Sequence, residues 1–230
     1  MGVCSKDDGI GIGMKVKIVP TVLVYDVVAL EEKLSIFDGL VERVQLDVID
    51  EEFAAKPTLD LERMLGQQTG LDKDVHLMTA EPIDYLQFCA DEAIKMVVGQ
   101  IEAMSNQKEF VDEARRLELK VGLAVDLETN FKELDWEIAK TADQLLIMTV
   151  RAGREGQKFN RKGLEKVAQL RKKGFDKEIC VDGGVNEKTI AGCVKAGADV
   201  LAVGSVLREG GSVKENLEKL TKLALNAGRG

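Results

Sequence analysis

The sequence predicts an α/β protein, a (β/α)8 TIM barrel, from three observations. Short β-branched apolar segments alternate with helical segments eight times along the chain. The predicted strands are apolar at almost every residue, which is typical of a parallel sheet covered by helices on its outer face. Polar residues gather where these strands end, and the carboxyl ends of barrel strands form the active-site face. A doubly wound open sheet is the alternative, but it usually has fewer strands and does not explain so many polar strand ends.

The eight units follow one another without a break. The strand segments are, in order, KVKIVPTVLV, RVQLDVI, KDVHLM, AIKMVVG, KVGLAVD, QLLIMTV, EICVDGG and DVLAVGS. Each is followed by a segment with apolar residues at helical spacing. These predicted helices cover residues 28–40, 59–65, 83–90, 109–119, 131–140, 161–173, 187–195 and 213–225. Units of about 25 to 30 residues are the size expected for a barrel of this kind.

Length and composition favour a single domain. The chain has 230 residues, of which 45% are hydrophobic, enough for one large core. We expect residues 15–230 to form the barrel and residues 1–14 to be a flexible N-terminal leader. Three glycines in that leader, Gly9, Gly11 and Gly13, imitate a dinucleotide-binding loop. They precede the first strand instead of following it, which argues against that function.

Charge and cysteine usage exclude several classes of partner. The formal net charge is −8 and the pI is near 5.0, so we expect neither a nucleic acid nor a membrane as partner, because both favour a basic surface. An anionic small molecule would need a local site. The four cysteines show no paired spacing and there is no apolar signal segment. These features predict reduced thiols and a cytoplasmic protein.

Polar residues occupy the end of every predicted strand after the first. They are Gln45, Asp47 and Asp50, then His76, Gln100, Asp126, Thr149, Asp182 and Ser205. Gln45 and Asp47 are two residues apart on one strand, so both side chains face the same way, and we expect them to point into the barrel. Asp50 has the opposite parity or belongs to the following loop.

Asp47, His76 and Asp182 are predicted to converge at the mouth of the barrel. His76 is the only histidine in the chain. A single histidine is commonly a hydrogen-bonded structural residue, and that interpretation stands when it is considered alone. The two carboxylates at neighbouring strand ends favour a functional role instead.

Two glycine-rich segments follow the last two strands. VDGGVN covers residues 181–186 and VGSVL covers residues 203–207. Barrel enzymes bind phosphate at this place, because a backbone without Cβ atoms lets several N–H groups approach an anion. The alternative is that these glycines only turn the chain. Their presence in two adjacent loops favours a phosphate site.

Four segments, DVHLM, LIMTVRAGREGQKF, VDGGVN and GADVLAVGS, resemble the signature segments of the ribulose-phosphate 3-epimerase family, in order and across nearly the whole chain. The resemblance implies a barrel of the ribulose-phosphate binding type. It implies an isomerase of the pentose phosphate pathway that acts on a small phosphosugar by 1,1-proton transfer at C3 of a ketopentose 5-phosphate. It also implies a homo-oligomer.

The resemblance also implies roles for particular residues. Asp47 and Asp182 would be the two proton-transfer residues, one on each face of the substrate carbon. One divalent metal ion (Mn, Fe, Zn, Co or Mg) would be held at the positions of Gln45, Asp47, His76 and Asp182. The residues that would contact the substrate or its phosphate are Met78, Met148, Gly153, Gly156, Gly183, Gly184, Gly204 and Ser205.

Departures from the family pattern leave two alternatives open. Gln45 stands where the family has its first metal histidine, and an amide oxygen binds zinc poorly and favours harder ions such as Mn²⁺ or Mg²⁺. A non-catalytic or differently specific phosphosugar-binding paralogue is therefore one alternative. A lyase of the hexulose-phosphate synthase type is a weaker one, because Ile49 replaces the lysine of its D-x-K-x-x-D strand. Arg151 and Arg154 either clamp an anion or pair with Glu155 and Glu52 on the surface.

Overall fold

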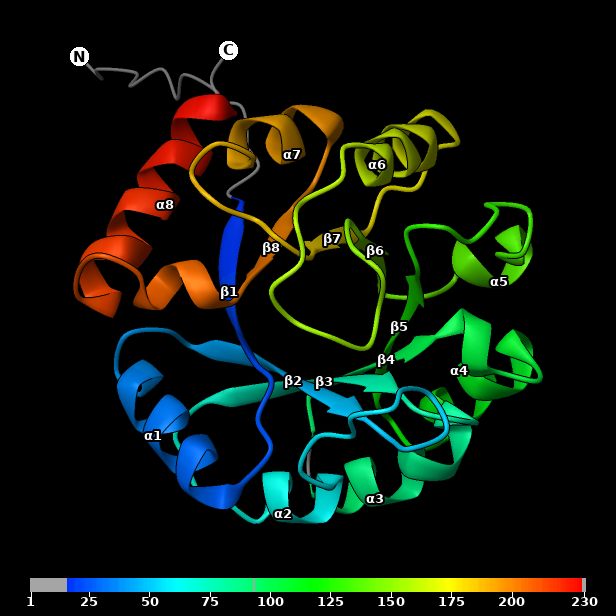
Figure 1. The fold of residues 1–230 in the computed structure, drawn as a ribbon. Coiled ribbons are helices and arrows are strands. Elements are labelled where there is room, and N and C mark those ends of the chain that lie inside the picture. Colours follow the sequence, from blue (N-terminus) through cyan, green and yellow to red (C-terminus); the bar gives the residue numbers. More distant parts are fainter. Residues whose placement is uncertain (1–15, 93, 229–230) are drawn as a thin grey trace, which may run out of the picture.

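A computed structural model describes residues 16–92 and 94–228 and shows a closed barrel of eight parallel strands surrounded by helices (Figure 1). Each strand pairs with the next, and β1 closes the barrel by pairing with β8 from Lys17 opposite Val200 to Pro20 opposite Val203. The predicted (β/α)8 fold is confirmed. The predicted leader, residues 1–14, lies outside the described residues.

Strands and helices alternate through the chain. The strands are β1 (Lys17–Val22), β2 (Arg43–Ile49), β3 (Asp72–Met78), β4 (Met96–Gln100), β5 (Lys120–Val125), β6 (Gln144–Met148), β7 (Glu178–Asp182) and β8 (Val200–Val203). The α-helices are α1 (Val27–Phe37), α2 (Leu61–Leu65), α3 (Leu86–Asp91), α4 (Gln107–Arg116), α5 (Trp136–Ala139), α6 (Lys162–Lys172), α7 (Ile190–Ala196) and α8 (Val213–Ala227). Three 3₁₀ helices are η1 (Pro82–Tyr85), η2 (Ile101–Ala103) and η3 (Ser205–Arg208).

Each strand is buried on both faces, which is why the sequence is apolar at consecutive positions. Residues that face outward, such as Leu46 and Val75, belong to the large core between the strands and the helices. Residues that face inward, such as Val98, Leu146 and Cys180, form a smaller cluster inside the barrel. Because parity alternates along a strand, the polar side chains of Gln45 and Asp47 lie on the inner face, as the sequence predicts.

Several helices are shorter than the sequence pattern suggests. The predicted helix 131–140 is reduced to the four residues of α5, because Asp135 caps it by accepting hydrogen bonds from Glu137 N and Ile138 N. The predicted helix 83–90 is split into η1 and α3. The longest helix, α8, begins at a capping box in which Ser212 and Glu215 bond each other's backbone. No helix in the described part of the chain is long and apolar enough to cross a membrane.

The amino-terminal end of the barrel is closed by a partly buried polar network, in which Asp74 and Gln144 are buried. Arg43 Nε lies 3.2 Å from Asp74 Oδ2, and Arg43 Nη2 donates to Glu178 Oε1 at 3.3 Å. Gln144 Nε2 donates to the same Glu178 oxygen at 2.6 Å. Burial raises the pKa of Asp74 to about 7, although the Arg43 guanidinium acts in the opposite direction. The network therefore depends on Arg43 to keep Asp74 ionised.

The Arg43–Asp74 pair gives a stability prediction. At about pH 8 we expect Arg43→Met to lower the free energy of unfolding by about 3 kcal/mol, because it leaves the Asp74 carboxylate buried without its counter-charge. The folded-state pKa of Asp74 lies above its usual value of 3.8. Protonation of Asp74 therefore stabilises the folded state fully below pH 3.8, and this stabilisation is lost as the pH rises through about 7. The loss of unfolding free energy caused by Arg43→Met, measured by denaturant unfolding, is expected to be smaller at about pH 5, where Asp74 is largely protonated.

The control is the double variant Arg43→Met/Asp74→Asn, in which an amide without charge replaces the carboxylate. It is expected to recover part of the stability lost at the higher pH. An equal loss at both pH values, with no recovery in the double variant, would contradict this role of the pair.

Candidate active site

The carboxyl ends of the strands enclose one pocket that collects most of the residues expected from the sequence. Of the predicted site residues, those that line it are Asp47, Met78, Met148, Gly153, Gly156, Asp182, Gly183, Gly184, Gly204 and Ser205. Gln45 and His76 lie beneath it, buried in the barrel interior. The structure therefore brings together segments from β2, β3, β6, β7 and β8 that are far apart in the sequence.

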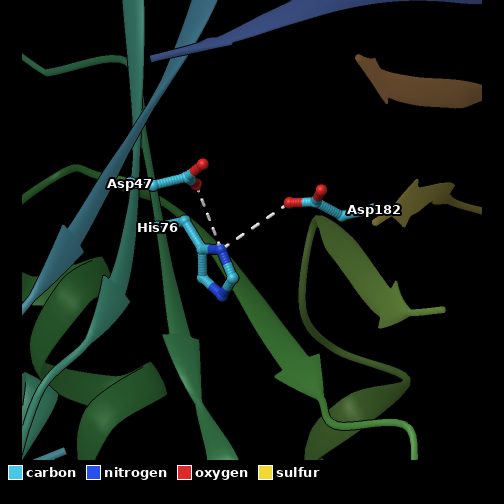
Figure 2. Close-up of side chains that lie close together, drawn as sticks. All are labelled: Asp47, His76 and Asp182. Carbon is cyan, nitrogen blue, oxygen red and sulfur yellow. Dashed lines mark ion pairs between the residues drawn. The ribbon is translucent and has the colours of Figure 1, made fainter. Parts of the chain in front are cut away.

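Asp47 and Asp182 face each other across the barrel interior (Figure 2). The amide nitrogen of Gln45 joins them: Nε2 donates to Asp47 Oδ1 at 2.8 Å and to Asp182 Oδ2 at 2.7 Å. One amide group thus satisfies one oxygen of each carboxylate. Both acids remain only slightly accessible, with 6% and 9% of their surface exposed, and that surface opens into the pocket.

His76 lies directly beneath the two acids and is fully buried. It is the register partner of Asp47 in the pairing of β2 with β3. Its Nε2 lies 2.9 Å from Gln100 Oε1, which assigns the proton to Nε2. Its Nδ1 makes no hydrogen bond and points between the carboxylates, 3.4 Å from Asp47 Oδ1 and 3.9 Å from Asp182 Oδ2 (Figure 2).

The electrostatics of this cluster follow from burial and mutual proximity. Burial and the neighbouring Asp47 carboxylate raise the pKa of Asp182 to about 7. Burial lowers the pKa of His76, but its contact with the Asp47 carboxylate and the charge of Asp182 outweigh that effect and raise it overall. Two carboxylates this close in a largely buried site favour a shared proton or a cation between them.

The cluster has the donor set of a metal site. Asp47, His76 and Asp182 each offer one ligand atom, and these atoms lie within 4.8 Å of one another. In its neutral form His76 presents the lone pair of Nδ1, which has no hydrogen-bond partner, to two carboxylate oxygens, an arrangement that a divalent cation would stabilise. The contact between Gln100 and Nε2 supplies the outer hydrogen bond that orients a metal-binding imidazole. The residues present therefore fit a divalent ion.

The loop after β7 contains two glycines with a strict backbone requirement. Gly183 and Gly184 have φ values of +106° and +65°, which L side chains rarely adopt. A Cβ atom on Gly184 would also lie 2.8 Å from Phe159 N. The loop after β7 thus packs against the loop after β6 and exposes its backbone to the pocket beside Gly204 and Ser205. Such a loop can bind an anion through N–H groups.

The apolar part of the pocket lies near the two acids. Met78 ends β3 and Met148 ends β6, and both side chains line the cavity. Met78 also packs with Leu23 and Ile49 in a small buried cluster. These side chains restrict the access of water to the carboxylates.

Other polar residues at strand ends have structural contacts instead. Asp50 accepts hydrogen bonds from Phe53 N at 2.7 Å and from Ala80 N at 2.8 Å, so it ties the loop after β2 to that after β3. Thr149 Oγ1 donates to the carbonyl of Asp182 at 2.9 Å. Asp126 accepts from Ala152 N at 3.3 Å. None of the three lines the pocket.

Polar pocket residues that the sequence pattern did not indicate as site residues include Thr21, Lys33 and Arg208. Lys33 lies on α1, and Arg208 ends η3, where no strand-end pattern could have indicated them. Thr21 is an inward position of β1 and could have been found from parity. Of the two arginines whose role stayed open, Arg154 lines the pocket and Arg151 does not. Neither forms an ion pair with a described residue.

Comparison with known proteins identifies the family to which this chain is similar. The model of the ribulose-phosphate 3-epimerase family matches residues 17–208. The ribulose-phosphate 3-epimerase of Schizosaccharomyces pombe is 29% identical over 93% of this chain and 96% of the relative. That of Treponema pallidum is 31% identical over 83% of this chain and 90% of the relative.

Solved structures support the fold. The 3-hexulose-6-phosphate synthase of Salmonella typhimurium superimposes with a TM-score of 0.66 over 92% of this chain and 100% of that chain, at 16% sequence identity. At that identity the likeness concerns the barrel alone. The match of the family model to most of the chain, together with the relatives of similar length, shows that this chain belongs to the ribulose-phosphate 3-epimerase family.

Proposed function

We propose that this protein is a phosphosugar epimerase that transfers protons at C3 of a ketopentose 5-phosphate, with Asp47 and Asp182 as its two acid–base residues. The observation that carries the proposal is the placement of these two carboxylates on opposite sides of one pocket, beside a glycine-rich loop suited to a phosphate. Membership of the epimerase family supports it.

The chemistry needs one carboxylate ionised and the other protonated in each turnover. The ionised group removes the proton from C3, next to the carbonyl, and the C–H electron pair moves into an enediolate. The protonated group then returns a proton to C3 from the opposite face, which inverts the centre. The raised pKa of Asp182 is consistent with one proton held by the pair near neutral pH.

The surrounding residues position the substrate and exclude water. Gly183, Gly184, Gly204 and Ser205 would bind the phosphate through their backbone, which fixes the distance from that group to C3. Met78 and Met148 would cover the reacting carbon. A divalent ion bound by Asp47, His76 and Asp182 would supply a Lewis acid for the oxygens of the enediolate.

A second candidate function rests on Gln45. Its Nε2 lies between the two acids and donates to both, so the amide links the two carboxylates by hydrogen bonds without an ion. A phosphosugar-binding paralogue without epimerase activity would retain the glycine loops and this bridge. The lyase alternative has less support, because Ile49 lies in an apolar cluster and offers no cation.

Turnover distinguishes the two functions. We expect the wild-type protein, supplied in turn with Mn²⁺, Fe²⁺, Zn²⁺, Co²⁺ and Mg²⁺, to interconvert ribulose 5-phosphate and xylulose 5-phosphate in an NMR assay. Asp47→Asn and Asp182→Asn should each lower kcat about 100-fold or more, because each removes one proton-transfer group. Asp126→Asn is the matched control, since Asp126 also follows a strand but does not line the pocket. Wild-type turnover no faster than that of Asp47→Asn with every metal would refute the epimerase and favour the paralogue.

Metal uptake tests the role of Gln45. We propose that the protein binds one divalent ion through Asp47, His76 and Asp182, with the Gln45 amide rotated to present its oxygen. Gln45→His is expected to raise zinc affinity about tenfold or more, because imidazole suits zinc better than an amide oxygen. Titration calorimetry and metal analysis of the purified protein measure this change.

The control for metal uptake is His76→Gln, which removes the imidazole whose Nδ1 has no hydrogen-bond partner. It should weaken metal binding both in the wild-type protein and in Gln45→His. If wild-type protein and His76→Gln take up the same amount of metal, the ion is not held at this cluster.

A further inference from the structure

The active-site pocket contains three cationic side chains whose presence is not explained by the glycine-rich loop after β7 or by the pair of Asp47 and Asp182. Lys33, Arg154 and Arg208 all line it. None of the three forms an ion pair with a described residue. In a chain with a net charge of −8, cationic side chains that line a concave site without forming ion pairs indicate an anionic ligand.

Arg208 is placed beside the phosphate loop by the geometry of η3. This 3₁₀ helix runs from Ser205 to Arg208, and side chains three residues apart in such a helix eclipse one another. Arg208 therefore projects from the same face as Ser205, and both residues line the pocket. A guanidinium at this position can donate two parallel hydrogen bonds to a phosphate whose other oxygens face the loop.

Lys33 reaches the same region from α1. Its Nζ donates to the carbonyl of Leu23 at 2.6 Å, just beyond the end of β1. The ends of β1 and β8 are adjacent, because these strands pair and a Cβ atom on Gly204 would lie 3.0 Å from Thr21 Oγ1. The ammonium group has three donors and uses one on Leu23, so two remain for a ligand.

Lys33 and Arg208 are close enough to influence each other. Burial and the positive charge of Arg208 lower the pKa of Lys33. The carboxylates of Glu155 and Asp47 act on Lys33 in the opposite direction but do not outweigh these two effects. An anion bound between Lys33 and Arg208 would reduce the repulsion between them. Arg154 and Glu155 also line the pocket and carry opposite charges.

We propose that Lys33 and Arg208 form a side-chain anion clamp over the glycine loop, which binds the phosphate dianion of the substrate and selects phosphorylated over unphosphorylated sugars. The identity of the phosphorylated molecule rests on the proposed function. Binding of the phosphate group itself does not, so inorganic phosphate serves as a probe that needs no turnover.

The test uses Lys33→Met, Arg208→Gln and the double variant, with Arg151→Gln as control. Arg151 precedes the same loop as Arg154 but does not line the pocket, so its replacement removes one positive charge without touching the clamp. Arg208 is exposed, and its variant should fold even if loss of the contact between Lys33 and Leu23 disturbs α1. Lys33→Arg keeps the charge and should restore part of the binding.

Calorimetry with inorganic phosphate is expected to show about tenfold weaker binding for each single variant and a further loss for the double variant, because each removes a charge-assisted contact. Wild-type affinity should fall steeply with added salt, and that of the double variant should fall less. For ribulose 5-phosphate, KM should rise while kcat changes less.

Phosphate affinity and KM of the double variant equal to those of Arg151→Gln would overturn the clamp and leave the epimerase proposal intact. Failure of the wild-type protein to bind phosphate would also overturn the clamp. Phosphate binding that depends on both residues, without turnover under any metal, would support the clamp and refute the epimerase.

Discussion

The contact between Gln45 and the two aspartates determines how the rest of the site is organised. Asp47 and Asp182 belong to strands on different parts of the barrel wall, and the Gln45 amide nitrogen donates to both at 2.8 and 2.7 Å. Like charges at this separation in a buried cavity repel strongly, so both acids cannot be ionised without compensation. The amide, the imidazole of His76, and a proton or a cation are the means of compensation that the barrel provides. The same requirement makes the pair suitable for exchanging protons with a substrate.

The closed barrel fixes this contact more firmly than a loop could. Asp47 and His76 are register partners on adjacent strands, and a slip of one residue would turn both side chains into the outer core. Asp182 is aligned with Met148 by the pairing of β6 with β7. The partly buried network of Arg43, Asp74 and Glu178 closes the opposite end of the same strands. On β2 and β3 this network is continuous with the site, because Gln45 is the register partner of Asp74 and Asp47 is that of His76. Inward residues of the other strands form an apolar cluster.

The proposed anion clamp would give the pocket an acidic part and a cationic part, and this polarity would orient a ligand. Asp47 and Asp182 make one end acidic, whereas Lys33 and Arg208 make another part cationic. A phosphosugar placed with its phosphate near the cations and the glycine loop presents its carbon chain to the acids. The reverse orientation would bring a dianion against two carboxylates, which is unfavourable at short range. Binding orientation would then follow from charge before any specific hydrogen bond to the sugar is made.

The sequence predicted the barrel and the convergence of Asp47, His76 and Asp182, because both follow from strand periodicity and from the position of strand ends. The alternation of side chains along the strand predicted that Gln45 and Asp47 lie on the inner face and that Asp50 does not. In the structure Asp50 joins the loops after β2 and β3 by hydrogen bonds. Lys33 and Arg208 could not be predicted in this way, since they reach the pocket from a helix and from a 3₁₀ turn through tertiary packing. The bridging contact of Gln45 was likewise out of reach, because it depends on the distance between β2 and β7. The short α5 reflects a cap at Asp135 within a segment whose apolar pattern runs longer.

In the proposed reaction Asp47 and Asp182 act on opposite faces of one carbon. The most direct measurement is the exchange of the C3 hydrogen in deuterium oxide, followed by NMR for ribulose 5-phosphate and xylulose 5-phosphate separately with Asp47→Asn and Asp182→Asn. Each variant keeps one of the two bases. Each is therefore expected to exchange the C3 hydrogen of only one epimer, and the two variants are expected to act on opposite epimers. Exchange of the same epimer by both variants, or of both epimers by either variant, would contradict it.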